Sequence, residues 1–316
     1  MASPSLDNNT DSSSSTSTEP VTIVLAGATG ALGLLIAHHL RQRGATVRAL
    51  VRPEASAKAE AESLRLQGVT LVEIDYNNTA ELVKACMGAA CVVSALSGLR
   101  EVIVDTQTQL LEAAVAAGVP RFIPSDFSAD FTKLPDNSNR NFDLRREFMR
   151  RLDQAPIQAT SILNGMFMEL LKGQAPLILS GPRRILYWGD ADQLLDFTTM
   201  VNTAEFTAAA ALDPTTPRYL RVAGDVASIR GLQAAATEAM GKEFRLLRAG
   251  SLGVLGALIK VTRTLVPAKG EVFPPWQGMQ YLHNMLSGQA KLESLDNARY
   301  PTIRWTSVRK MLATKQ

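Results

Sequence analysis

Short apolar runs alternate with helical patterns of apolar positions from Val21 onward. The apolar runs are continuous rather than alternating, which is typical of strands buried on both faces of a parallel sheet. Strands that alternate with helices in this way require crossover connections and helices on both faces of the sheet. The expected strands are residues 21–26, 45–51, 69–74, 90–95, 121–124 and 157–163, and the expected helices are residues 31–43, 55–66, 79–86, 101–117 and 141–154.

The pattern becomes irregular after Asn164. Strand-like pieces at 177–179, 185–188, 219–222 and 244–247 mix with helical patterns at 203–212 and 229–240, and Pro274-Pro275 and Tyr300-Pro301 mark loops. We therefore predict an α/β fold with two parts. Residues 21–165 form a doubly wound parallel sheet, and residues 166–316 form mainly a smaller C-terminal α/β lobe, from which some segments return to the sheet.

The first 20 residues differ from the rest of the chain. Residues 11–19 are almost entirely Ser and Thr, and no apolar run precedes Val21. Such a segment cannot bury enough surface to offset its ordering entropy, so we expect residues 1–20 to be a disordered tail. The tail has neither Lys nor Arg and does not resemble a signal peptide or a mitochondrial presequence. The apolar stretch at residues 252–259 is far too short to span a membrane. We expect a cytoplasmic protein with no membrane partner.

Composition excludes several other classes of protein. The chain has 33 Lys and Arg against 30 Asp and Glu, a net charge of +3, which is too small to predict nucleic-acid binding. The arginines at 145, 146, 150 and 151 share a helical pattern with acidic residues, so we interpret them as a solvated helix face. Cys86 and Cys91 lie in apolar surroundings and are expected to be buried, inert thiols. The three histidines lack ligand spacing, so we predict no metal.

A glycine-rich turn carries the clearest chemistry. Gly27-Ala-Thr-Gly-Ala-Leu-Gly33 follows a predicted strand and opens a predicted helix. Gly27 and Gly30 allow the backbone to turn sharply beside a pyrophosphate, Gly33 allows the helix to pack closely on the sheet, and the helix N-terminus offers N–H groups to phosphate. The spacing is GxxGxxG, one residue longer than the usual GxGxxG turn. We predict that Gly27, Thr29, Gly30, Ala31, Leu32 and Gly33 bind a dinucleotide; the alternative is a glycine-rich turn without a ligand.

The end of the second strand predicts which dinucleotide binds. An acidic residue here would bind the ribose hydroxyls of NAD(H), but the chain has Val51-Arg-Pro53. Arg52 is a permanent cation whose planar donors suit a phosphate, so we predict NADP(H). Arg48 should lie too far back on the same strand. The alternative interpretation of Arg52 is an ordinary surface arginine at a strand end.

These residues together resemble a known family. The GATGALG turn, the VRALVRP segment and Ser94-Ala-Leu-Ser-Gly98, followed by Arg121–Phe127, Asn164-Gly-Met-Phe167 and Asn297–Trp305, are similar to the NmrA-like and isoflavone-reductase-like branch of the atypical short-chain dehydrogenases. The resemblance implies an NADPH-binding Rossmann domain and a small substrate lobe, with either reductase activity or redox sensing without turnover. It also implies that Ser97, Ser125 and Phe127 contact the cofactor and that Asn164, Met166 and Phe167 contact the substrate.

The chain departs from this family at the proton donor. No tyrosine is followed by a lysine four residues later, so the usual Tyr-x-x-x-Lys pair is missing. Isoflavone-reductase-like enzymes carry a lysine on the helix after the fifth strand, and here Phe142-Asp-Leu-Arg145 places arginine at that position. Arg145 could stabilise an oxyanion but cannot act as an acid. Asp126 and Lys133 are alternative proton donors. Arg145 could instead belong to the surface helix and pair with Asp143, Glu147 or no partner.

Two functions remain open at this level. The first is an NADPH-dependent reductase of a small carbonyl, conjugated or quinone-like substrate, with Arg145 as the catalytic residue. An electrophilic substrate would accept hydride without a strong acid. The second is a non-catalytic NADP(H) sensor that binds a protein partner. The sequence predicts neither the identity of the substrate nor the oligomeric state.

Overall fold

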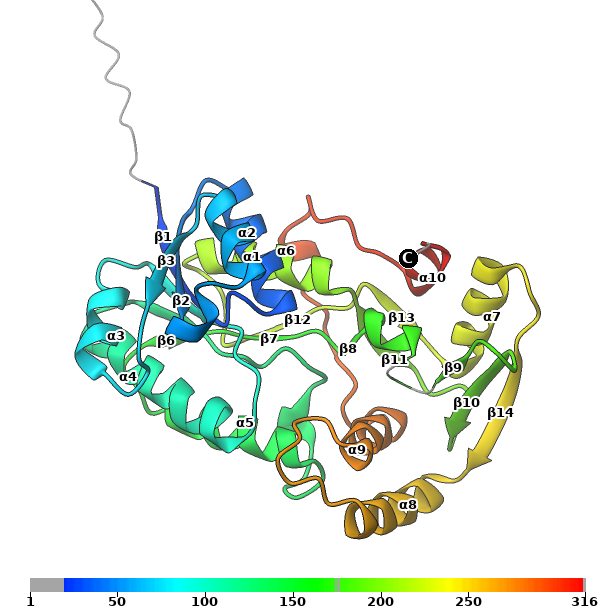
Figure 1. The fold of residues 1–316 in the computed structure, drawn as a ribbon. Coiled ribbons are helices and arrows are strands. Elements are labelled where there is room, and N and C mark those ends of the chain that lie inside the picture. The colour runs from blue at the N-terminus through cyan, green and yellow to red at the C-terminus, as the bar shows by residue number, and fades with distance from the viewer. Residues whose placement is uncertain (1–19, 174, 176, 315–316) are drawn as a thin grey trace, which may run out of the picture.

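The computed structural model describes residues 20–173, 175 and 177–314. Apart from Pro20, the predicted tail of residues 1–20 lies outside these ranges. Figure 1 shows two parts: a sheet flanked by helices at the left, which contains the blue and cyan N-terminal elements, and a smaller lobe at the right, which contains most of the yellow and red C-terminal elements.

A six-stranded parallel sheet forms the larger part, in the order β3-β2-β1-β4-β5-β6. The chain passes from β3 at one edge to β4 on the other side of β1, so the direction in which strands are added reverses between β1 and β4. This is the switch point at which doubly wound sheets bind their ligands. The strands are β1 Thr22–Ala26, β2 Thr46–Val51, β3 Thr70–Glu73, β4 Cys91–Ser94, β5 Arg121–Ile123 and β6 Gln158–Ala159.

Helices cover both faces of the sheet because its strands are apolar on both sides. Ile23 and Leu25 of β1 belong to one buried cluster, and Val24 and Ala26 belong to another on the opposite face. The first face is covered by α1 Ala31–Gln42, α2 Ala59–Leu66 and α6 Met200–Leu212, and the second by α3 Thr79–Cys86, α4 Gln107–Ala116 and α5 Arg140–Leu152. The predicted Rossmann-type doubly wound fold is therefore confirmed.

Helix α6 returns from the second half of the chain to the sheet and packs against α1. Arg121 of β5 fixes its end. The buried guanidinium donates to the carbonyls of Ala210 and Ala211 at 2.8 and 2.9 Å and to the hydroxyl of Thr216 at 2.7 Å. The second half of the chain thus supplies part of the helical cover of the first.

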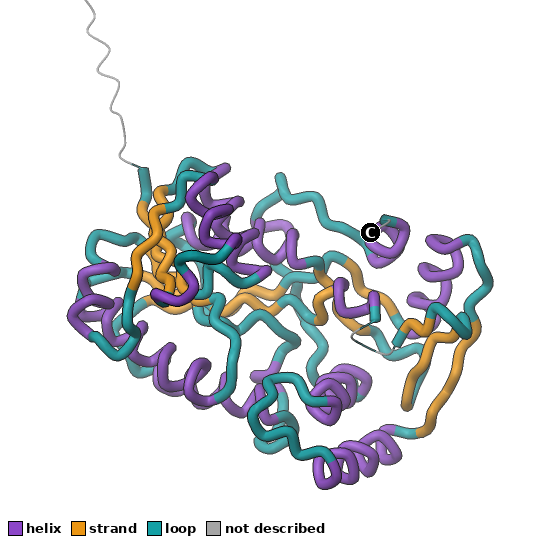
Figure 2. The backbone as a smooth tube through the Cα atoms, in the orientation of Figure 1, coloured by secondary structure: helices purple, strands orange, loops and turns teal. Residues whose placement is uncertain are grey.

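The C-terminal lobe contains short strands in small sheets and several helices, as Figure 2 shows. Strand β11 pairs with β8 and β13, β10 pairs with β9 and β14, and β12 pairs with β7. The lobe has its own apolar core, which includes Phe197, Leu232 and Phe244. The strands after β6 are β7 Ser161–Leu163, β8 Met166–Phe167, β9 Ile178–Leu179, β10 Arg184–Trp188, β11 Leu195–Thr198, β12 Tyr219–Arg221, β13 Asp225–Ala227 and β14 Arg245–Gly250. Of these, β7 and β12 extend toward the large sheet, since Ile162 and Leu220 belong to its buried cluster. The helices of the lobe are α7 Ile229–Met240, α8 Leu252–Leu265, α9 Pro275–Leu286 and α10 Val308–Ala313.

Three predicted elements differ in the structure. The sixth strand, predicted as one piece over 157–163, is divided at Thr160, since β6 pairs with β5 whereas β7 pairs with β12. The helix predicted over 101–117 begins with a π-helical segment, Glu101–Thr106, before α4. Pro275, predicted to lie in a loop, is the first residue of α9, where the missing N–H of proline costs nothing.

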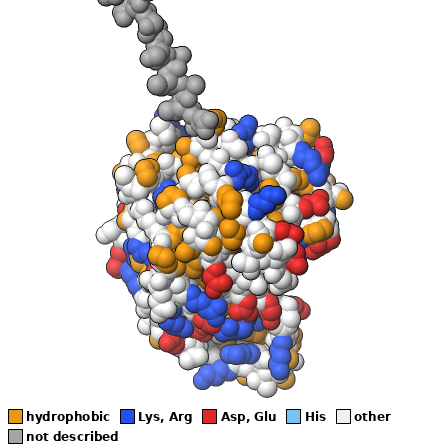
Figure 3. Space-filling model, turned by 90° about the vertical axis from the view of Figure 1, so that its left-hand side faces the viewer, with side chains coloured by type: hydrophobic (Ala, Val, Ile, Leu, Met, Phe, Trp, Pro, Cys, Tyr) orange, Lys and Arg blue, Asp and Glu red, His pale blue; other side chains and the backbone are white. Residues whose placement is uncertain are grey.

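The structure also describes the cysteines, the surface charges and the other features that we considered from composition. Cys86 and Cys91 are free and buried as predicted, and burial raises the pKa of Cys86 to about 11. On the face shown in Figure 3, acidic and basic side chains lie among one another in the lower half rather than gathering by sign. Within the described ranges, no helix is both long and apolar enough to cross a membrane. Across those same residues, no group of three or more His, Cys, Asp or Glu side chains is placed to hold a metal ion.

Candidate functional site

The glycine turn lies where β1 ends at the switch point. Gly27 has a φ of +75°, and a Cβ there would lie 2.5 Å from the carbonyl oxygen of Ala95. A Cβ on Gly33 would lie 2.1 Å from the carbonyl oxygen of Gly27. Both distances are far below van der Waals contact, so only glycine fits at either position. The turn closes through a hydrogen bond of 3.1 Å from the N–H of Gly30 to the carbonyl of Gly27.

The N-terminus of α1 is open at this turn. Gly30 is the N-cap, so no side chain caps the helix, and the first turn contains no acidic residue. Thr29 and Leu32 are half-buried, whereas Gly30 and Ala31 are exposed. The first-turn N–H groups and the positive end of the helix dipole therefore form a site suited to a phosphate. The structure brings together all six residues predicted from the motif.

The ends of β4 and β5 lie beside this turn. The hydroxyl of Ser125 donates to the carbonyl of Leu96 at 2.7 Å, and its N–H donates to the side-chain carbonyl of Gln107 at 2.9 Å. Ser125 and Phe127 are buried, whereas Ser97 is exposed at the end of the β4 segment. Together with Arg52 after β2, the predicted cofactor residues therefore follow four neighbouring strands, β2, β1, β4 and β5, at their carboxyl ends.

Gln107 is a positioning residue that the sequence analysis missed. Its fully buried amide also donates to the carbonyl of Ile103 at 3.0 Å, inside the π-helical segment. Segments of this kind often occur near functional sites. The available signal was an amide among the apolar positions of the predicted helix at 101–117.

Arg52 lies directly after β2, and 69% of its side chain is exposed. Its Nε lies 3.3 Å from a carboxylate oxygen of Glu54. Arg48, on the same strand, donates instead to the carbonyls of Ala85 and Met87 at 3.2 and 2.6 Å, at the end of α3. Of these two arginines, Arg52 is therefore the one that is available to a ligand.

Arg145 projects from α5 toward the end of β5. Its Nε donates to the carbonyl of Ser125 at 3.2 Å and its Nη1 to the carbonyl of Asn141 at 3.4 Å. The side chain is half-buried and forms no ion pair with any residue that the structure describes. The two carboxylates considered as its partners are occupied: Asp143 pairs with Arg146, and Glu147 pairs with Arg100 and Arg151.

The neighbouring arginines of α5 do not form one solvated face. Arg146 is buried, and its guanidinium donates to the carbonyls of Phe131 and Leu134 at 3.0 and 3.2 Å. It also pairs with Asp136 at 3.1 Å. The interpretation of this cluster as an exposed helix face is therefore wrong for Arg146, which ties α5 to the loop before it.

Asp126 is a buried carboxyl beside Arg145. Its Oδ2 accepts from the hydroxyl of Ser161 at 2.6 Å, and its Oδ1 is buried and has no partner within the described part of the chain. Burial raises the pKa of Asp126, while the Ser161 bond and the charge of Arg145 oppose the increase. Lys133, the other alternative donor, is half-exposed and pairs with Glu293 at 2.8 Å, so its ammonium group is already engaged.

The predicted substrate segment follows β7. Asn164 has no exposed surface, and neither its amide nitrogen nor its amide oxygen has a partner among the described residues. Gly165 has a φ of +67°, and a Cβ there would lie 2.3 Å from the carbonyl oxygen of Asp196, so the chain passes close to β11. Met166 is also buried, and Phe167 is half-buried. Phe167 is thus the member of this segment that a ligand can reach without rearrangement.

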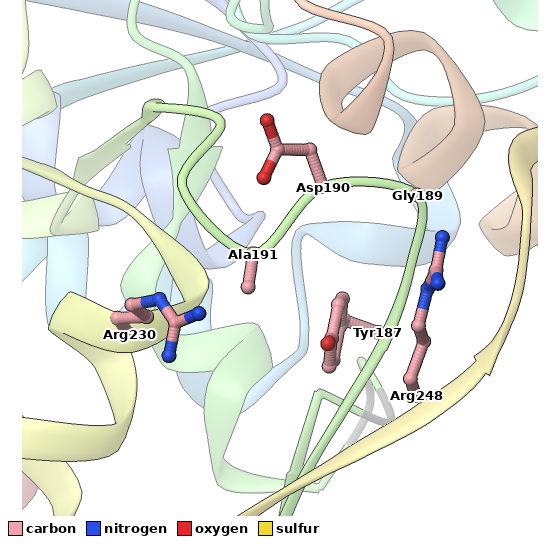
Figure 4. A pocket seen from close by; sticks show the side chains of 6 residues that line it. All are labelled: Tyr187, Gly189, Asp190, Ala191, Arg230 and Arg248. Carbon is pink, nitrogen blue, oxygen red and sulfur yellow. The ribbon is translucent and has the colours of Figure 1, made fainter.

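Two hollows lie in the C-terminal lobe. The first, of about 370 Å³, is lined by Tyr187, Gly189, Asp190, Ala191, Arg230 and Arg248. Figure 4 shows the side chains of Tyr187 and Arg248 next to each other, as expected from their pairing between β10 and β14. The second hollow, of about 620 Å³, lies beside β9 and α10. Neither hollow is lined by a predicted site residue.

Comparison with known proteins gives the family of the chain. The chain is 30% identical over 213 residues to pinoresinol reductase 1 of Arabidopsis thaliana. This alignment covers 63% of the chain and 67% of the reductase. The fold of the chain is similar to a structure of AtPrR2 with NADP+ and (+)-pinoresinol, at a TM-score of 0.79 and 22% identity over 94% of this chain and 99% of the other.

An NADPH-dependent quinone oxidoreductase from Escherichia coli has the same fold, with a TM-score of 0.69 and 20% identity over 92% and 98% of the two chains. The model of the NmrA-like family matches residues 19–266, most of the chain. The protein therefore belongs to the NmrA-like family, as the sequence motifs indicated.

Proposed function

We propose that the protein is an NADPH-dependent reductase that delivers hydride to a small carbonyl, conjugated or quinone-like substrate. The observation that carries the proposal is the glycine turn at the switch point. A Cβ at Gly27 or Gly33 would collide with backbone atoms, and the adjoining N-terminus of α1 has no side-chain cap. Such a cradle fits a pyrophosphate. The NADP+ complex of AtPrR2 and the NADPH-dependent quinone oxidoreductase support this assignment.

Arg52 selects NADP(H) in this proposal. Its exposed guanidinium follows β2, at the position from which doubly wound sheets contact the adenosine ribose. Glu54 is a competing anion, but an exposed ion pair contributes only about 0–1 kcal/mol. The guanidinium can therefore turn from Glu54 to a 2′-phosphate, which offers it a bidentate contact.

Arg145 stabilises the negative charge that develops on the substrate oxygen. NADPH, when bound, supplies the hydride, so the side chains need only bind, orient and neutralise. The bonds from Arg145 to the carbonyls of Ser125 and Asn141 hold its guanidinium at the end of β5. Its fixed charge favours an oxyanion but gives no proton. Substrates that are electrophilic before protonation, such as quinones and conjugated carbonyls, suit this site best.

The substrate rests between Arg145 and Phe167 in this proposal. Phe167 offers a partly open aromatic side chain for an apolar or planar ligand. Asn164 and Met166 support this segment from within, and their predicted contact with substrate requires the segment to open. Gly165 keeps the turn close to β11, because a side chain there would collide with Asp196.

Turnover measurements test the proposal directly. NADPH oxidation is followed with a quinone, a conjugated enone and an unactivated ketone, and transfer of deuterium from C4 of labelled NADPH confirms hydride transfer. We expect the quinone or the enone to be reduced faster than the ketone. If NADPH binds but none of the three acceptors is reduced, the reductase proposal is overturned.

A non-catalytic NADP(H) sensor is the second candidate. The specific observation in its favour concerns the three considered proton donors. Arg145 cannot donate a proton, Asp126 is buried, and the ammonium group of Lys133 bonds to both Glu293 and the carbonyl of Lys291. A sensor should bind NADP+ and NADPH with different effects on its capture of a protein partner, and it should show no hydride transfer. The labelled-cofactor experiment therefore separates the two candidates.

A further inference from the structure

Helix α8 has two apolar faces. Leu255 and Ile259 are buried in the core of the C-terminal lobe, and the helix packs against α9. On another face, a second set of large apolar residues repeats at intervals of four, three and four positions, which places them in one stripe along the helix. This exposed stripe consists of Val254, Leu258, Val261 and Leu265, whose exposed fractions are 51, 39, 54 and 75%.

The stripe continues into other exposed apolar residues along the chain. Leu247 in β14, before the helix, is 43% exposed, and Val266 and Phe273, after it, are 48 and 63% exposed. Single exposed apolar side chains are ordinary, but a helix face made of them marks a site of interaction. In Figure 1, α8 lies at the lower edge of the molecule, next to α9 and to the ends of β10 and β14. The stripe residues are exposed on this helix and can therefore meet a partner.

Basic residues predominate along the segment that carries the stripe, and the nearest acidic residues in sequence, Glu243 and Glu271, lie at its two ends. Residues 244–270 contain five basic residues and no acidic residue. Arg245 pairs with Glu243, and Arg263 lies over the ring of Trp276 at 5.1 Å. The other three, Arg248, Lys260 and Lys269, form no ion pair with any residue in the described ranges. An exposed apolar stripe with an excess of cations is complementary to an anionic, apolar partner.

We propose that α8 docks the protein on anionic phospholipid bilayers. The helix would lie in the plane of the interface, with its stripe among the acyl chains and its lysines at the headgroups. A second copy of the chain is less suitable, because a symmetric contact through α8 would place like charges together. The helix has 14 residues, so it lies on the membrane and does not cross it. This proposal replaces our sequence expectation of no membrane partner, which considered only spanning segments.

Vesicle co-sedimentation tests the proposal on the full chain. Wild type should bind vesicles of phosphatidylcholine mixed with phosphatidylserine, bind pure phosphatidylcholine weakly, and lose affinity as salt rises. Val261→Asp with Leu265→Asp should weaken binding at least about a hundredfold. Lys260→Glu with Lys269→Glu, which leaves the stripe intact, should weaken it roughly thirtyfold.

Two control variants change the same chemistry elsewhere. Leu66→Asp alters an 81%-exposed apolar residue on α2, and Lys84→Glu with Lys310→Glu makes the same change in net charge on α3 and α10. Both should bind vesicles as wild type does, and circular dichroism melts should be similar for all variants. The lysine variant tests the proposal even if the aspartate variant is unstable.

Three results would overturn the proposal. The first is wild-type protein that does not bind the anionic vesicles. The second is an α8 lysine variant that binds as tightly as its control. The third is a dimer in light scattering that is lost with Val261→Asp and Leu265→Asp while vesicle binding is unchanged, which would assign the stripe to a second copy. These readouts do not depend on reductase activity.

Discussion

Arg52→Asp should reverse the preference for NADPH over NADH. The side chain follows β2 and is 69% exposed, and its one ion pair is with Glu54 at 3.3 Å. Because that pair is exposed, the cost of breaking it is at most about 1 kcal/mol. The substitution therefore acts almost entirely through the lost contact with the 2′-phosphate.

The magnitude follows from two contributions. A charge-assisted hydrogen bond to phosphate is worth about 1.5–3 kcal/mol. The new carboxylate adds repulsion of about 1 kcal/mol at ~4 Å in water. The sum of about 2.5–4 kcal/mol corresponds to a roughly seventy- to thousandfold increase in the Kd for NADPH. NADH lacks the 2′-phosphate, so its Kd should change less than about threefold.

Glu54→Gln gives a prediction of opposite sign. It removes the anion that competes for Arg52, so NADPH should bind about two- to fivefold more tightly. Fluorescence titrations with both cofactors measure each effect, and Arg309→Asp on α10 is a control for the change in charge. Equal losses for NADPH and NADH in Arg52→Asp, or wild-type affinities for both, would refute the role of Arg52.

Three further predictions concern the turn and the end of β5. Gly33→Ala should abolish measurable NADPH binding and lower the free energy of unfolding by about 3 kcal/mol, the upper end of the usual cost of overpacking. Gly30→Ala, whose Cβ would lie 3.3 Å from the nearest backbone oxygen, should lower the free energy of unfolding less in a denaturant titration. Arg145→Ala should lower kcat/KM about a hundredfold with little change in the Kd of NADPH. Wild-type turnover in this variant would refute the catalytic role of Arg145. If Arg145→Lys reduces unactivated ketones faster than wild type does, the lack of a proton donor limits the wild-type reaction. Burial raises the pKa of Asp126, so the folded state keeps this proton to higher pH than the unfolded chain. The stability of wild type relative to Asp126→Asn should then fall as pH rises from about 4, by about 1.4 kcal/mol per unit of pKa difference, and a difference that does not vary with pH would contradict this.

Local signals made the parallel sheet predictable, but they did not give the change of partner at Thr160. Residues 157–163 were predicted as one strand, and nothing within this segment distinguishes pairing with β5 from pairing with β12. The division depends on residues far along the chain, since Thr160 and Gln158 bond to Thr216 at 2.8 and 3.1 Å. The local order of apolar and polar residues carries no information about such distant partners.

At the candidate site, too, some features were predictable from local sequence and others depend on distant parts of the chain. The glycine turn was predictable because a side chain at Gly27 would collide with Ala95 after β4, and one at Gly33 would collide with Gly27 in the turn itself. The full burial of Asn164 was not, since it depends on how β8 and β11 meet. Helix α8 was missed because Gly253 and Gly256 lower its helix propensity, and the packing of Leu255 and Ile259 supplies the compensation.

The guanidinium of Arg121 couples the local unfolding of β5 to the local unfolding of the C-terminal end of α6. If α6 detached alone, this cation would remain buried in the sheet without the carbonyls of Ala210 and Ala211, which is a costly state. The amides of β5 and of the last turn of α6 should therefore exchange with deuterium at similar rates. A protein cut near residue 165 would lose α6 and with it part of the helical cover of its sheet, so the nucleotide-binding half depends on the sequence that follows it.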